Sequence, residues 1–99
     1  MASSKEYLGF VLDRLSLVEK LTFRAMMGEY ILYVNGKVVG GIYDDRLLIK
    51  DTNSVKKLIP DASYELAYEG AKPMLSVKNE FDKDFLARLF NAAANDLMK

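Results

Sequence analysis

The stretch of sequence that decides the fold is EYILYVNGKVVGGIY, residues 29–43. Its first part is rich in β-branched and aromatic residues, and the dipeptide Asn35-Gly36 follows directly. These two residue types tolerate the positive φ angles that both central positions of a type I′ turn require. The stretch therefore predicts a β-hairpin with strands over 29–34 and 38–43. The pair Gly40-Gly41 in the return strand predicts a bulge or a close backbone approach.

One further strand is predicted on each side of this hairpin. Before it, apolar and polar residues alternate over 21–27, and Gly28 ends the pattern. After it, Asp44-Asp45 forms a second tight turn that leads into a strand over 46–50. The four strands follow each other through short connections, so we expect an antiparallel meander.

A first helix precedes the meander and a short second helix follows it. Ser3 and Glu6 fit a capping box at the start of the first helix, and apolar residues then recur at helical spacing, at Leu8, Val11, Leu12 and Leu15. The second helix is predicted over 54–59. Pro60 ends it, because the residue before a proline disfavours the α conformation.

The chain ends in one more strand and a long helix. A polar and aromatic connection over 61–70 precedes a strand over 74–78, and apolar residues at helical spacing predict a helix over 82–97. Strands and helices that are segregated in this way indicate an α+β fold, in which helices cover one face of an antiparallel sheet. Ninety-nine residues suffice for one hydrophobic core, so we expect a single domain over 1–99.

The charge balance and the missing residue types argue against several classes of function. The 14 basic residues are balanced by 14 acidic ones, and no block of like charge occurs, so we expect no direct binding of duplex DNA by the domain alone. The chain has no cysteine and no histidine, which removes thiolate zinc sites and the commonest general base. We expect no metal and no cofactor. The N-terminus lacks an apolar signal core, and no apolar run is long enough to span a bilayer, so a cytoplasmic protein without membrane contact is expected.

Residues 24–30 read RAMMGEY and resemble the R-x-M-[FM]-G-E-Y signature of the N-terminal domains of TfoX/Sxy competence regulators. The spacing of that family is also kept at Leu32-Tyr33, Asn35-Gly36-Lys37, Asp44-Asp45-Arg46-Leu47, Lys50 and Gly70-Ala71-Lys72-Pro73. The resemblance covers nearly the whole chain. It implies a compact α+β domain with an outline similar to secretion chaperones, and a role in regulation. The family usually has glycine where this chain has Ile31, and its longer members carry a second, C-terminal domain.

Several of these residues have both a structural and a functional interpretation. Arg24 is expected either to pair with Glu29 across the Gly28 corner or to bind an anionic group of a partner. If the first strand alternates, one of Met26 and Met27 faces the core, and the other is available as an adaptable contact.

The turn and loop motifs carry a similar choice. Two adjacent carboxylates can hold a hard cation, but Asp44 and Asp45 are also ordinary turn residues, and the turn interpretation is favoured. The segment Gly70-Ala71-Lys72-Pro73 lacks the spacing of a phosphate-binding loop, so a structural loop is favoured there.

The function predicted from the sequence is a non-enzymatic regulatory or adaptor module that acts by protein contact. A hydrolase would need a nucleophile with a base, and no motif with suitable spacing occurs. The partner-binding candidates are Arg24, Met26, Met27, Gly28, Glu29, Tyr30, Tyr33, Lys50, Gly70, Lys72 and Pro73. An unidentified protein partner and a homodimer are expected. The alternative is a sensor of a small anionic ligand, in which Arg24, Lys50 and Lys72 close a pocket between sheet and helices.

Overall fold

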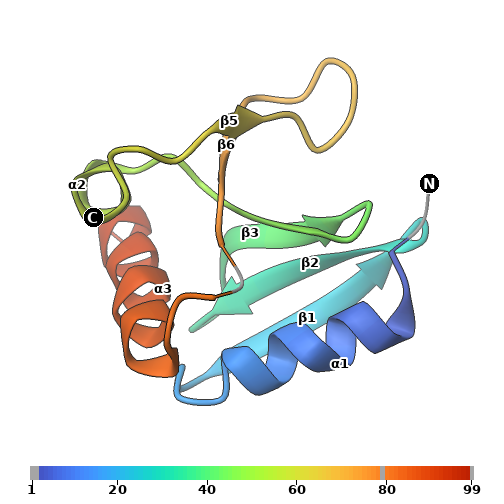
Figure 1. Cartoon of the computed structure of the whole chain (residues 1–99), viewed down its shortest axis with the longest axis horizontal. Coiled ribbons are helices and arrows are strands. Elements are labelled where there is room, and N and C mark those ends of the chain that lie inside the picture. The colour runs from blue at the N-terminus through green and yellow to red at the C-terminus, as the bar shows by residue number, and fades with distance from the viewer. Residues whose placement is uncertain (1–2, 79, 99) are drawn as a thin grey trace.

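Six strands form one antiparallel sheet, and three helices accompany it, in the computed structural model, which describes residues 3–78 and 80–98 (Figure 1). This is the α+β fold that the sequence predicts. The elements in chain order are α1 (Lys5–Arg14), β1 (Leu21–Met26), β2 (Glu29–Val34), β3 (Lys37–Tyr43), β4 (Arg46–Ile49), α2 (Asn53–Leu58), β5 (Tyr64–Glu65), β6 (Met74–Ser76) and α3 (Lys83–Leu97). The strands lie in the order β1-β2-β3-β4-β6-β5.

Two-residue turns join the first four strands. Asn35 and Gly36 have φ angles of 53° and 80°, and Asp44 and Asp45 have 53° and 55°, so both predicted tight turns are confirmed. A third such turn, at residues 27–28, joins β1 to β2, with φ angles of 52° and 84°. Positive φ at both central residues gives these turns the twist that matches antiparallel strands. The first four strands are therefore the predicted meander.

The glycine pair in β3 lies next to a bulge and at a close backbone approach, the two alternatives that it predicts. Leu32 pairs with Gly40 but Tyr33 pairs with Val38, so one residue of β3 is left over and forms a bulge. A Cβ atom on Gly40 would lie 2.1 Å from the carbonyl oxygen of Leu48 on β4. Only glycine therefore allows the two strands to approach this closely.

The core lies on one face of the sheet, beneath the helices. Its buried residues come from α1, from β2, β3 and β4, and from α3, and they include Val11, Leu15, Leu32, Val34, Ile42, Ile49, Leu86, Leu89, Phe90 and Ala93. The predicted helical spacing in the first and last helices is thus the spacing of core contacts. Within the described residues, no helix combines the length and the apolar character that a membrane crossing needs.

The start of α1 differs from the prediction. The side chain of Ser4, and not that of Ser3, caps the helix by accepting a hydrogen bond from the Tyr7 amide at 3.0 Å. Ser3 is buried and its hydroxyl donates to Glu29 Oε1 at 2.7 Å. The prediction was wrong because a tertiary contact with β2 takes the hydroxyl that the local motif would have used.

The two later strands also refine the prediction. Residues 64–65, predicted as part of a connection, form β5, which pairs with β6. A strand of two residues has no measurable alternation, so only the tertiary pairing reveals it. The second helix begins at Asn53 after the cap Thr52, one residue earlier than predicted. The last helix begins at Lys83, one residue later than predicted, because Asp82 is its cap.

Candidate functional site

The candidate site lies on the face of the sheet that the helices leave uncovered. In β2, Leu32 and Val34 point to the core, so Ile31 and Tyr33 point to the opposite face. The register places Arg24 opposite Ile31 and Met26 opposite Glu29, on that same face. We call this surface the open face. It comprises the outward side chains of β1 to β4 and the loop over 66–73 that covers part of them.

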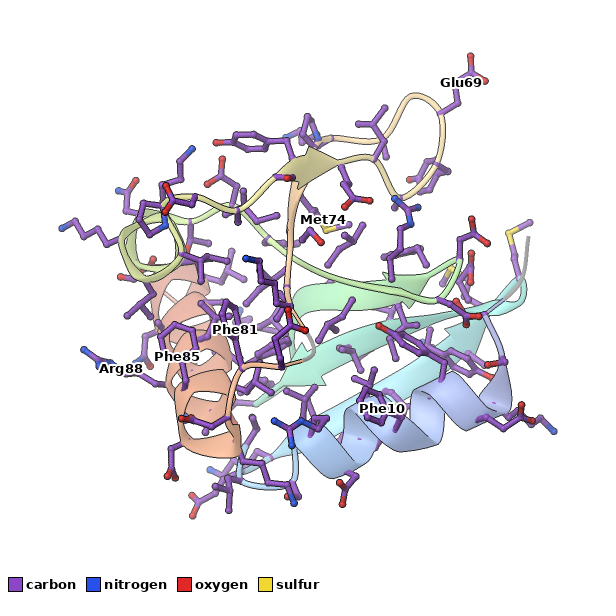
Figure 2. The ribbon with its side chains drawn as sticks, in the orientation of Figure 1. Phe10, Glu69, Met74, Phe81, Phe85 and Arg88 are labelled. Carbon is purple, nitrogen blue, oxygen red and sulfur yellow. The ribbon has the colours of Figure 1, made fainter. Side chains whose placement is uncertain are left out.

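The loop over 66–73 connects β5 to β6 and rises on the side of the sheet away from α1 (Figure 1). Figure 2 shows Glu69 at its tip, pointing away from the sheet, and Met74 where the chain enters β6. Gly70 has a φ angle of 87°, and the amide of Ala71 donates to the carbonyl of Tyr68 at 3.1 Å. Residues 68–71 therefore form a hydrogen-bonded turn.

Arg46 ties the start of this loop to the meander. Its guanidinium forms an ion pair with Glu65 at 2.6 Å and donates to the Leu66 carbonyl at 3.1 Å. Its third contact is a hydrogen bond to the carbonyl of Tyr43 at 3.1 Å. The planar guanidinium can direct donors to all three oxygens at once, which a lysine cannot do. Arg46 therefore fixes where the loop stands over the sheet.

The first hollow of the open face is lined by methionine and aromatic side chains. It has a volume of about 330 Å³, and its walls are Met26, Met27, Glu29, Ile31, Tyr43, Ala67 and Tyr68. Met27 is 97% exposed and Tyr68 is 67% exposed. We call this hollow the methionine cleft. Neither methionine faces the core, so that prediction was wrong: Met27 lies in the turn, where strand alternation has ended.

A second hollow adjoins the methionine cleft through shared residues. It has a volume of about 430 Å³ and is lined by Lys50, Lys72 and Pro73, among others. Tyr43 and Tyr68 line both hollows. Lys50 and Lys72 are thus brought together, as the anion-sensor alternative predicts. Asp51 lines the same hollow and offsets part of their positive charge.

Arg24 lies elsewhere on the open face. It lines a third hollow, with Thr22, Tyr33 and Gly36, and is exposed. The prediction that Arg24, Lys50 and Lys72 close one pocket is therefore wrong. The reason is the strand order: β1 is an edge strand, whereas Lys50 follows β4, and two strands separate them.

Glu29 has a structural role in place of the predicted pairing with Arg24. Its Oε1 accepts hydrogen bonds from the amide and hydroxyl of Ser3 at 2.9 and 2.7 Å, and its Oε2 accepts one from the amide of Asp44 at 3.0 Å. The hydroxyl of Ser3 also accepts from the Asp45 amide at 3.0 Å. Glu29 thus joins the N-terminal segment to the β3–β4 turn and fixes one end of the methionine cleft.

Tyr43 stands where the methionine cleft meets the lysine-lined hollow. A Cβ atom on Gly41 would lie 2.6 Å from its ring, so the absence of a side chain at Gly41 leaves the space that the ring occupies. Burial raises the pKa of the Tyr43 phenol, and the neighbouring Tyr68, Glu29 and Tyr33 raise the pKa further. The phenol is therefore held in its neutral form, able to donate a hydrogen bond.

The remaining predicted site residues divide between the two faces. Tyr30 packs against the core side, and its ring meets that of Phe23 edge-on, with centroids 6.0 Å apart. Its neighbours in the signature, Met27 and Gly28, form the β1–β2 turn. Sequence reasoning did not select Ile31, Tyr43, Ala67 or Tyr68 for the site. Counting alternation outward from the Asn35-Gly36 turn would have placed Ile31 and Tyr33 on one face.

Comparison with known proteins gives one relative. A protein of Spirochaeta aurantia, described as an uncharacterized 12.7 kDa protein in the trpE 5′ region, is 36% identical over 72 residues. The match covers 73% of this chain and 63% of that protein, so the chain spans less than two thirds of its relative. No protein-family model matches the chain, and no solved structure matches it.

Proposed function

We propose that this chain is a non-enzymatic regulatory module of the TfoX N-terminal type, which binds a protein partner through the methionine cleft. The signature residues support this in two ways. Gly28 and Glu29 have structural roles, at a positive φ angle and in the contact with Ser3. Met26 and Met27 lie at the surface, where such apolar side chains are suited to a partner.

The observation that carries the proposal is the exposure of large apolar side chains around one hollow. Met26, Met27 and Tyr68 are 48%, 97% and 67% exposed, and all three line the methionine cleft. Methionine repacks readily around varied partners, and tyrosine is enriched at protein interfaces. The partner we propose inserts an apolar side chain into the cleft and presents an acidic group to Lys72 in the adjoining hollow.

Site-specific photocrosslinking in the native cell tests this proposal. A benzophenone amino acid replaces Met27 in one variant and Tyr68 in another, and the matched control carries it at Arg88, on the outer side of α3 (Figure 2). We expect both cleft positions to yield an adduct with the same partner and the Arg88 position to yield none. The substitution Tyr68→Glu should abolish the adduct formed from position 27. Equal adducts at all three positions, or none at either cleft position, would contradict the proposal.

A second candidate function follows from the pair Lys50 and Lys72. They line one hollow together with the phenol of Tyr43, so a small anion of the phosphate or carboxylate class is the ligand that suits it. Melting temperatures measured with a panel of such anions test this. A ligand should raise the melting temperature of the wild type and of Arg24→Ala, but not of a Lys50→Glu/Lys72→Glu variant. A shift that survives the double substitution would exclude this site.

Two further properties belong to the proposal. The domain acts in the cytoplasm, and it self-associates as a homodimer. Self-association is supported by the modest stability of a domain of this size and by the exposed edge of its sheet.

A further inference from the structure

The sheet has two very different edges. β5, at one end, is only two residues long, whereas β1, at the other, is six residues long and exposed over Thr22–Met26. Exposed edge strands are usually protected by proline, a bulge or a short length. β1 contains no proline and its register with β2 is continuous, so its protection is limited to the single charged side chain of Arg24. The long edge is therefore the one that needs a partner.

The hydrogen-bonding pattern shows which backbone groups of β1 are free. The amide of Asn35 donates to the carbonyl of Lys20 at 3.1 Å, and the two-residue turn closes on the pair Met26 and Glu29. In an antiparallel ladder, residues that hydrogen-bond to the neighbouring strand alternate with residues whose backbone groups point away from it. The even-numbered residues of β1 therefore direct their N–H and C=O groups toward β2. Leu21, Phe23 and Ala25 therefore direct their N–H and C=O groups outward. Within residues 3–78 and 80–98, no backbone hydrogen bond joins these three residues to another segment.

We propose that β1 pairs with β1 of a second copy, antiparallel about a two-fold axis that passes through Phe23. The inference rests on the self-association proposed above and names its surface. A two-fold pairing satisfies the long edges of both copies at once. Pairing of β1 with β5 of another copy would engage only two residues of β5. It would also give an open head-to-tail assembly, which always ends in an unpaired β1 edge.

The register follows from symmetry and charge. A two-fold axis normal to the sheet places residues of the same parity opposite each other. With Phe23 on the axis, Leu21 pairs with Ala25 of the second copy, and the three outward-facing residues of each β1 all form hydrogen-bonded pairs. Arg24 then lies opposite Thr22. A competing register, with the axis at Arg24, places two guanidinium groups directly opposite each other. It also pairs fewer of the residues whose N–H and C=O groups point away from β2, so it is disfavoured.

This dimer has a consequence for the methionine cleft. Because the axis is normal to the sheet, the two open faces lie on the same side of one continuous sheet, and each copy contributes one cleft next to β1. A partner with two docking segments can then occupy both clefts, and its binding gains from the raised effective concentration of the second segment.

Single-cysteine crosslinking tests the register directly, because the chain contains no native cysteine. Phe23→Cys should form a disulfide dimer under mild oxidation, since the two Cα atoms of a directly opposite bonded pair are about 5.5 Å apart. Thr22→Cys and Arg24→Cys are the matched controls. Both should stay monomeric, because position 22 of one copy lies opposite position 24 of the second copy, and two cysteines at the same position do not meet. A disulfide formed most readily at Arg24 would overturn the register.

Sedimentation tests the interface in the unoxidised protein. The wild type should show a species of twice the 11.2 kDa chain mass at micromolar concentration. Thr22→Glu should tighten the dimer about two- to tenfold, because each new carboxylate faces an arginine across the axis. Ala25→Pro should give a folded monomer, because it removes an outward-facing N–H, whereas Ala25→Val should stay dimeric. A wild type that is monomeric at all concentrations overturns the proposal, as does a dimer that Ala25→Pro leaves intact. Crosslinking at Met27 reports on the protein partner separately, so the two proposals fail independently.

Discussion

Gly40 and Gly9 occupy opposite environments, and this difference gives a prediction at the scale of single residues. A Cβ atom on Gly40 would meet the backbone of β4 at 2.1 Å, whereas a Cβ atom on Gly9, in α1, would have no atom within 4 Å. We expect Gly40→Ala to lower the free energy of unfolding by about 1–3 kcal/mol, the usual cost of overpacking. Gly9→Ala should raise it by about 0.5–1 kcal/mol, because alanine favours the helix.

Chemical denaturation of the two glycine variants beside the wild type measures both effects. Gly9→Ala serves as the matched control, since it is the same substitution without a steric conflict. Equal stability of the two variants would mean that β3 and β4 can separate without cost at Gly40.

Tyr43 gives a second prediction at this scale, on pH. Burial raises the pKa of its phenol in the folded state, while the unfolded value stays near 10. The unfolded chain therefore loses this proton at a lower pH than the folded one, and stability falls as pH rises above about 10. We expect Tyr43→Phe to make the free energy of unfolding less dependent on pH above about pH 10. Identical slopes for the two proteins would contradict a buried phenol.

At the scale of elements, the tight turns set the register of the meander. Gly36 has a φ angle of 80°, a region that β-branched residues adopt poorly. Gly36→Val should therefore lower the free energy of unfolding by more than about 1 kcal/mol. Gly36→Asn is the matched control and should cost less, because asparagine tolerates positive φ. Thermal melts of both variants measure the difference. An equal loss of stability in the two variants would show that the φ angle at residue 36 does not determine the effect.

The edges of the sheet also belong to this scale. The alternation of apolar and polar residues over 21–27 predicts a strand with one face toward the core, yet five of the six residues of β1 are exposed. Its position at the end of the strand order explains this exposure, and makes it the element that we propose to join two copies.

At the scale of the whole molecule, the balance of charge predicts the response to nucleic acid. The 14 basic residues are matched by 14 acidic ones, and Arg46 and Lys83 are engaged in ion pairs with Glu65 and Asp13. Binding to duplex DNA relies on many unpaired cations that displace counterions from phosphates. We expect no sub-micromolar binding of the domain to mixed-sequence duplexes at about 50 mM salt, where such binding is strongest. Tight binding that weakens steeply with salt would contradict this, and fluorescence anisotropy measures it.

The sequence by itself determined the helices, the strands other than β5, and the tight turns at residues 35–36 and 44–45. The meander, the bulge at Val39 beside Gly40 and the final helix all follow from local patterns: side-chain alternation, residues that accept positive φ, and apolar residues at helical spacing. These features depend on neighbours in the chain, so they are visible without the fold.

Tertiary structure alone decided which residues share a surface. Ser3 leaves its capping motif to bind Glu29, and Arg24 and Lys50 are separated because two strands lie between β1 and β4. The methionine cleft joins residues 26–31 to Tyr68, and Arg46 fixes the loop that makes this contact possible. Such contacts link positions that are distant in the chain, and the free energy of packing, not local preference, selects them. For this reason the sequence predicted the strands but not the site that they form.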